Sequence, residues 1–265
     1  MLKKRLIFTL LYNNGQFMLS RNFRLQKVGD LGWLQTNYDF SRISFSIDEI
    51  IVLDVTRGVR DLDRFCDSMR ALAANCFVPI SAGGGVGDIA SARALLRSGA
   101  DKIVVNSVIA EAPSCVAALA REFGQQCVVA SVDLRRDSDG DLQVLTKSGS
   151  RPEMESAYAY LSRLAEMPVG ELYLNSIDRD GTGQGLDLSL LDVLPKAFTQ
   201  PVILAGGIGN ASHIYQGLTD NRLDAVATAH LFNFVGDGLI RARQTLINDG
   251  IALPFWDLDI LSRLK

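Results

Sequence analysis

The chain contains an internal repeat, in which a glycine-rich segment recurs in the second half of the sequence. The run Pro79-Ile-Ser-Ala-Gly-Gly-Gly-Val-Gly-Asp matches Pro201-Val-Ile-Leu-Ala-Gly-Gly-Ile-Gly-Asn, an offset of 122 residues (201 − 79). At that offset, residues 7–12 and 49–54 also lie over residues 129–134 and 171–176. Self-similarity at a fixed period indicates repeated structural units that bury their apolar faces against one another. We therefore predict two halves, at about residues 1–122 and 123–245.

Short β-branched runs alternate with helical patterns along the whole chain. Eight strands are predicted, at residues 5–12, 49–55, 77–83, 102–107, 127–134, 171–178, 201–207 and 225–232. Helical patterns follow several of them, at residues 88–98, 113–123, 153–166 and 212–220. Several strands are near-continuous apolar runs, which is typical of parallel strands that helices cover. Without a linker to divide the 265 residues, this order predicts one α/β domain over residues 1–265, a (β/α)8 TIM barrel of two half-barrel repeats.

Composition excludes several classes of protein. The net charge is −3 with 22% charged residues, so the basic surface of a nucleic-acid-binding protein is not expected. No apolar run reaches the ~20 residues that span a bilayer, and the apolar run near the start stops at Asn13, which argues against a membrane protein and against a signal peptide. Four cysteines without C-x-x-C spacing and only two histidines predict reduced thiols, a cytoplasmic location and no metal site.

Two glycine-rich turns are candidate phosphate sites. In a TIM barrel the active site lies at the C-terminal ends of the strands, where loops and helix N-termini commonly bind phosphate. Residues 83–85 and 206–207 end two predicted strands at repeat-related positions, with Asn106 and Ser107 near the first turn and Ala229 and His230 near the second. We predict an elongated ligand that is phosphorylated at both ends. The alternatives are two tight structural turns and, for His230, a packed strand-end histidine.

Asp133 ends the fifth predicted strand, where a carboxylate faces the same end of the barrel and can serve as a general acid or base. A solvated or capping aspartate is the alternative. The repeat places Leu11 at the corresponding position (133 − 122), so one of two expected opposed carboxylates is absent. The polar loop at residues 176–185, which carries Asp178 and Asp180, follows the sixth strand and is either a functional loop or an ordinary turn.

Four charged residues stand at the opposite ends of the strands. Arg5, Glu49, Lys102 and Glu171 begin four predicted strands, so they are expected to form a ring of two cations and two anions at the N-terminal face. A stabilising ion-pair cluster is the alternative, because this face of a TIM barrel usually serves stability.

Over nearly its full length the chain resembles the cyclase subunit of imidazole glycerol phosphate synthase. The most specific matches are Ser176-Ile-Asp-Arg-Asp-Gly-Thr, the Gly83-Gly84-Gly85 turn and Gly99-Ala-Asp-Lys102 followed by Asn106. The resemblance implies a heterodimer with a glutaminase subunit, which docks on the N-terminal face and releases ammonia into the barrel. It further implies a ribulosyl-aminoimidazole-carboxamide substrate with two phosphates, and no cofactor.

The resemblance also assigns roles to single residues. Asp133 takes the place of one of the family's two catalytic aspartates, and Asp101 faces the glutaminase. The first phosphate site corresponds to Gly85, Asn106 and Ser107, and the second to Asp180, Gly181, Gly207, Ala229 and His230. The ring of Arg5, Glu49, Lys102 and Glu171 corresponds to the gate through which ammonia enters.

The departures from the family concentrate in the first βα unit. The family's first strand reads Cys-Leu-Asp-Val-Asp-Asn-Gly, whereas this chain reads Thr9-Leu-Leu-Tyr-Asn-Asn-Gly15. Leu11 therefore replaces the second catalytic aspartate, Leu19 stands where an active-site lysine is expected, and His230 replaces a serine. Residues 35–46 also read poorly as the usual first helix. Leucine transfers no proton, and a positioned acid or base contributes roughly 10²- to 10⁴-fold in rate.

These departures favour a divergent paralogue that conducts ammonia over an efficient cyclase. Similar paralogues accompany amidotransferases in surface-polysaccharide pathways, where ammonia converts an acetamido sugar into an acetamidino sugar. On this hypothesis a third, sugar-amidating protein takes part, and the phosphate sites hold a phosphorylated small molecule. The alternative is a genuine cyclase that makes imidazole glycerol phosphate in histidine biosynthesis. A phosphosugar isomerase of the related half-barrel family ranks lowest, because it leaves the charged ring unexplained.

Overall fold

The computed structural model describes residues 3–38, 40–230 and 236–254. Eight parallel strands form a closed barrel in it, as the alternating pattern predicts. The barrel strands are β1 (Arg5–Asn13), β4 (Glu49–Asp54), β5 (Ile80–Gly83), β6 (Lys102–Val105), β7 (Val128–Arg136), β10 (Glu171–Ser176), β11 (Val202–Ala205) and β12 (Ala225–Thr228). They are hydrogen-bonded in the order β10-β11-β12-β1-β4-β5-β6-β7, and a further pairing of β7 with β10 closes the sheet.

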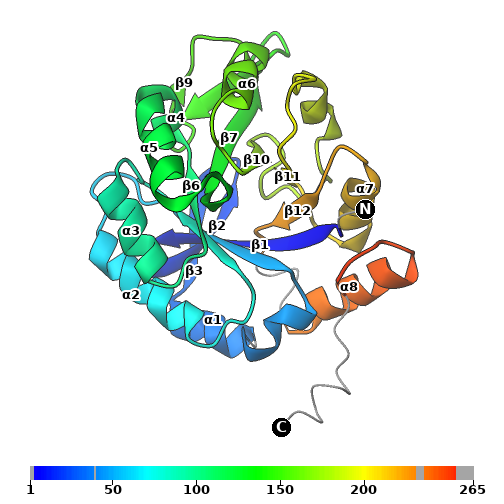
Figure 1. The fold of residues 1–265 in the computed structure, drawn as a ribbon. Coiled ribbons are helices and arrows are strands. Elements are labelled where there is room, and N and C mark those ends of the chain that lie inside the picture. The colour runs from blue at the N-terminus through cyan, green and yellow to red at the C-terminus, as the bar shows by residue number, and fades with distance from the viewer. Residues whose placement is uncertain (1–2, 39, 231–235, 255–265) are drawn as a thin grey trace.

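Helices surround this barrel (Figure 1). They are α1 (Leu31–Asn37), α2 (Leu62–Ala73), α3 (Ile89–Arg97), α4 (Ser107–Glu111), α5 (Pro113–Phe123), α6 (Ala157–Ala165), α7 (Ala211–Thr219) and α8 (Gly238–Asn248). The connections that the structure describes also contain the 3-10 helices η1 (Phe40–Phe45), η2 (Gln125–Cys127) and η3 (Leu188–Val193). Polar residues set several helix starts, because Asp61, Asp88, Ser156 and Asn210 each accept a hydrogen bond from a backbone N–H of the first turn.

The buried apolar residues of the described ranges form two separate cores. The larger core fills the layer between the barrel and the helices, and includes Phe8 and Leu10 of β1. The smaller core lies inside the barrel and includes Ile7, Ile51 and Tyr173. Successive residues of a strand point to opposite faces, so each barrel strand contributes to both cores.

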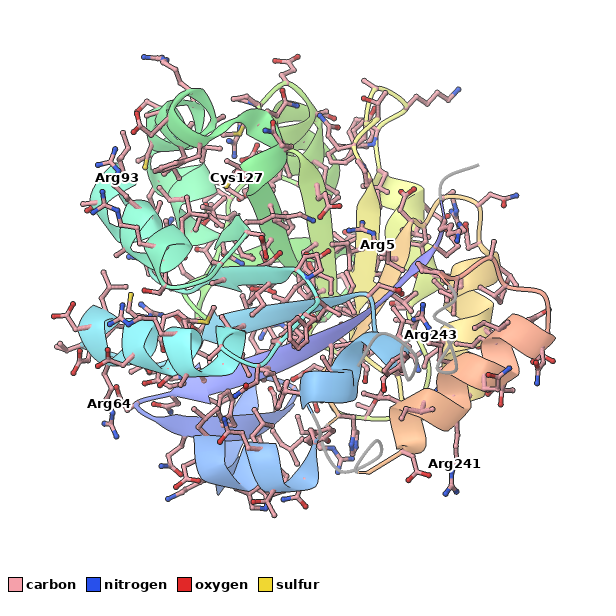
Figure 2. All side chains as sticks on the ribbon, turned by 60° about the horizontal axis from the view of Figure 1, so that its bottom comes forward. Arg5, Arg64, Arg93, Cys127, Arg241 and Arg243 are labelled. Atoms are coloured by element: carbon pink, nitrogen blue, oxygen red, sulfur yellow. The ribbon has the colours of Figure 1, made fainter. Side chains whose placement is uncertain are left out.

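A buried ion pair ties the last described helix to the barrel. The guanidinium of Arg243 on α8 lies 2.7 and 2.9 Å from the carboxylate oxygens of Asp48, which also accepts a hydrogen bond from the Leu6 backbone N–H. In Figure 2, Arg243 points toward the barrel, whereas Arg241 on the same helix points away from it. The pair fixes α8 near the N-terminal ends of β1 and β4.

Two antiparallel hairpins extend the barrel and were not predicted from the sequence. β2 (Gln16–Arg21) and β3 (Arg24–Gly29) continue from β1, while β8 (Leu142–Thr146) and β9 (Arg151–Pro152) continue from β7. β1 and β7 lie four strands apart in the closed order, so the two hairpins rise from opposite sides of the barrel. Both lie at the C-terminal ends of the strands.

Several predicted bounds were too long. The strand predicted at residues 77–83 begins only at Ile80, and the strand predicted at 171–178 ends at Ser176. The helix predicted at 153–166 begins at Ala157, because the Ser156 side chain caps it. The last predicted strand ends at Thr228, and residues 231 and 232 of that prediction lie outside the described residues. The poor helical pattern at residues 35–46 corresponds to the end of α1 and to η1.

Candidate functional site

A cavity of about 1030 Å³ opens at the C-terminal ends of the barrel strands. The structure brings together around it the positions that the resemblance assigns to catalysis or phosphate binding, whereas Asp178 of the loop at residues 176–185 does not line it and accepts a hydrogen bond from the Arg136 backbone N–H. The positions brought together are Leu11, Gly85, Asn106, Ser107, Asp133, Asp180, Gly181, Gly207, Ala229 and His230. The hydrogen bonds within this set show which side chains are already engaged by the protein.

Asp133 lies deep in the cavity between two amides. Asn106 Nδ2 donates to its Oδ2 at 2.8 Å, and Asn175 Nδ2 donates to its Oδ1 at 3.1 Å. Burial raises the pKa of Asp133 to about 6, although the hydrogen bonds from Asn175 and Asn106 lower it. A carboxyl group with this pKa exchanges its proton near neutral pH, which suits a general acid or base.

The opposite side of the cavity is apolar. Leu11 on β1 and Leu53 on β4 are paired neighbours in the sheet, and both line the cavity together with Leu19 of β2. We call these three residues the leucine wall. Since β1 and β7 lie on opposite sides of the barrel, the leucine wall lies across the cavity from Asp133. The structure thus places one ionisable carboxyl group on one side and no proton-transferring side chain at position 11 on the other.

The glycine turns have a structural requirement of their own. Gly84 has φ +111°, and a Cβ there would lie 2.2 Å from the Asp54 carbonyl oxygen. Gly206, which lies 122 residues later, has φ +94°, and its Cβ would lie 2.6 Å from the Ser176 carbonyl oxygen. The same close approach therefore recurs at the offset of the repeat. Gly85 and Gly207, the next residue of each turn, line the cavity, which is compatible with phosphate binding. Their role in phosphate binding stays a prediction.

The hairpin of β2 and β3 closes onto the loop after β10. Asp180 Oδ2 accepts a hydrogen bond from the Ser20 hydroxyl at 2.5 Å and from the Phe23 backbone N–H at 3.0 Å. The Asn22 side chain donates to the carbonyl oxygens of Ile177 and Asp178. Gly181 packs so closely against Ser20 that a Cβ would lie 1.9 Å from its carbonyl oxygen. Asp180 and Gly181 therefore hold the hairpin, which sequence reasoning missed, in addition to their predicted role in phosphate binding.

Six positively charged side chains also line the cavity. We call them the rim cations: Arg21, Arg24, Arg57, Arg60, Arg135 and Lys147. Arg57 donates to the Phe23 carbonyl oxygen and Lys147 pairs with Glu111. The side chains of Arg21, Arg24 and Arg135 form no ion pair or hydrogen bond with any residue that the structure describes. The chain as a whole carries a net charge of −3, so this excess of positive charge is local to the cavity. It favours an anionic ligand.

His230 lines the cavity beside Ala229 at the end of β12. Burial lowers its pKa, so the imidazole is neutral at neutral pH and offers one donor and one acceptor rather than a positive charge.

The four charged residues at the N-terminal ends of the strands form a closed ring. Arg5 lies 2.9 Å from Glu49 and 2.7 Å from Glu171, and Lys102 lies 3.2 and 3.0 Å from the same two carboxylates. Each cation therefore bridges both anions. The Ser81 hydroxyl also donates to Glu49, whose side chain is 3% exposed. Figure 2 shows Arg5 at the start of β1.

Inside the barrel, a hydrogen-bonded pair lies between the ring and the cavity. The hydroxyl groups of Thr9 and Tyr173 lie 3.2 Å apart, both residues are buried, and both line the floor of the cavity. Sequence reasoning missed this pair and Asn175. The alternation along β10 is a usable signal, because Glu171, Tyr173 and Asn175 are spaced two residues apart and therefore share the inner face.

Asp101 has a structural role beside the predicted partner contact. Its Oδ2 accepts a hydrogen bond from the Ile80 backbone N–H at 2.8 Å, which anchors the start of β5. Asp224 accepts one in the same way from Val202 at the start of β11.

Two further observations concern the described residues as a group. Among them, no set of three His, Cys, Asp or Glu side chains is arranged to hold a metal ion. No helix of this part of the chain combines the length and apolar character needed to cross a membrane.

The chain is similar to known proteins over most of its length. The model of the family described as histidine biosynthesis protein matches residues 41–236, which include every barrel strand except β1. A protein of Parasynechococcus marenigrum (strain WH8102), provisionally named imidazole glycerol phosphate synthase subunit hisF2, is 42% identical over 259 residues. That match covers 97% of this chain and 96% of the relative.

Proposed function

The chain belongs to the histidine biosynthesis protein family, as a homologue of the cyclase subunit of imidazole glycerol phosphate synthase, and on that premise we propose that it conducts ammonia. A glutaminase subunit docks on the N-terminal face near Asp101 and forms a heterodimer with it. Ammonia enters through the ring of Arg5, Glu49, Lys102 and Glu171 and reaches the cavity along the barrel interior. Its acceptor is an acetamido sugar of a surface polysaccharide, which a third protein activates for amidination.

One observation carries this proposal: the ring contains all four charged residues, whereas the cavity has an acid–base group at position 133 and none at position 11. Both cations of the ring contact both anions, at 2.7–3.2 Å. At the other end of the barrel, Leu11 faces Asp133 where the family has a second aspartate. The N-terminal face thus keeps the charged ring. The cavity lacks the pair of catalytic aspartates that closure of the imidazole ring needs.

A genuine cyclase in histidine biosynthesis is the second candidate. The raised pKa of Asp133, about 6, favours it, because a single carboxyl group with this pKa can accept and return a proton near neutral pH.

Replacement of Lys102 by alanine tests the proposed ammonia entrance. The variant removes one of the two cations that bridge Glu49 and Glu171 and leaves Arg5 alone to neutralise both carboxylates. We therefore expect its ability to stimulate the glutaminase partner to fall by about 5-fold or more, the usual size of a coupling between sites. Glutamate release by the complex measures this effect. Lys27→Ala, at an exposed lysine of β3, is the matched control. Equal stimulation by the two variants would show that the ring only stabilises the fold.

A further inference from the structure

The leucine wall is a feature of the cavity that ammonia conduction does not use. Leu11 is 9% exposed, and Leu53 packs partly on the inner core of the barrel, so their remaining surface faces the cavity. Leu19 adds apolar surface from the adjoining hairpin. A ligand with hydroxyl groups on every side would lose hydration against these side chains without gaining hydrogen bonds, which costs free energy. The wall therefore favours a ligand with an apolar group on this side.

The remaining sides of the cavity favour a ligand that is anionic and polar. The rim cations line the cavity. The turns that contain Gly85 and Gly207 place backbone N–H groups near the N-termini of α3 and α7. Asp133, Asn106 and Asn175 provide hydrogen-bonding groups across from the leucine wall. The cavity thus combines positive ends, one polar side and one apolar side.

We propose that this cavity binds a sugar bisphosphate that carries a small N-acyl group, with the acyl methyl group against the leucine wall. The inference rests on the proposed function, whose ammonia acceptor is an acetamido sugar, and on the prediction that the two glycine turns are phosphate sites. The sugar hydroxyl groups face Asp133 and its two amides, and the rim cations neutralise the phosphates. An N-acyl group fits because it presents a compact methyl to Leu11 and Leu53 while the rest of the ligand stays polar.

Two ligands that differ at one substituent test this assignment. N-acetylglucosamine 1,6-bisphosphate and glucose 1,6-bisphosphate share both phosphates and differ in whether the sugar carries an acetamido or a hydroxyl group. Isothermal titration of the full chain is expected to show about 10-fold tighter binding of the acetylated ligand, the effect of a small apolar group that fills an apolar pocket. Leu11→Asn is expected to bring the ratio of the two dissociation constants close to one.

Leu19→Asn is the second variant, because position 19 is partly exposed on a hairpin and tolerates a polar residue more readily than position 11. It is expected to reduce the ratio as well. The proposal is overturned if the unaltered chain binds both ligands equally, prefers the glucose compound or binds neither. It is also overturned if both variants keep the original ratio. Because neither glutaminase nor ammonia is present, this outcome is independent of the Lys102→Ala experiment.

Discussion

At the scale of single residues, the central feature of the cavity is the buried carboxyl group of Asp133. Asp133 is 7% exposed, and its two oxygens are occupied by Asn106 and Asn175. Burial nevertheless dominates, and the pKa rises to about 6. The folded chain therefore binds this proton more tightly than the unfolded chain, in which an aspartate titrates near ~3.9. Stability is expected to fall as the pH rises from about 4 through about 6.

Replacement of Asp133 by asparagine is expected to remove this part of the pH dependence, because the amide keeps the shape of the carboxylate without its charge. Urea unfolding at pH 5 and at pH 8 measures the effect. The variant's stability relative to the unaltered chain is expected to rise by about 1 kcal/mol between the two pH values, from the linkage between proton binding and folding. Asp139→Asn, at an exposed turn, is the control. An unchanged difference at both pH values would contradict the assignment of a raised pKa.

The barrel elements could largely be predicted from the sequence, whereas the hairpins could not. Runs such as Ile50-Ile-Val-Leu form parallel strands because both of their faces are buried, so the pattern itself carries the information. The hairpin of β2 and β3 mixes polar and apolar residues on a partly exposed ribbon, which leaves only the Asn14-Gly15 turn as a signal. Asn175 could not be assigned to Asp133 from the sequence, because their contact depends on the register between β7 and β10.

Asp180 is the residue that we expect to hold this hairpin in place. Asp180→Ala removes the acceptor of the Ser20 hydroxyl and of the Phe23 N–H. Loss of two hydrogen bonds to a carboxylate is expected to speed amide exchange in β2 and β3 by about 10-fold or more, which hydrogen–deuterium exchange measures by mass spectrometry. Asp178→Ala is the matched control, because its carboxylate accepts from the Arg136 N–H and not from the hairpin. Similar exchange in the two variants would show that Asp180 does not hold the hairpin.

At the scale of the whole molecule, the two ends of the barrel have different compositions. The N-terminal end carries a closed ring of four charges, and the C-terminal end carries a cavity with the buried carboxyl group of Asp133, a leucine wall and six rim cations. The sequence predicted which residues gather at each end, because parallel strands align their like ends. It could not predict the Thr9–Tyr173 contact between the two ends, since that contact joins side chains across the barrel interior.

Cyclase turnover shows whether the cavity retains ring-closing activity. The purified chain is supplied with ammonia and the doubly phosphorylated ribulosyl-aminoimidazole-carboxamide substrate, beside a Leu11→Asp variant. We expect turnover at least about 100-fold below that of an ordinary cyclase subunit, because position 11 provides no acid or base, and a measurable gain in the variant. Turnover by the unaltered chain near that of an ordinary cyclase would contradict this expectation.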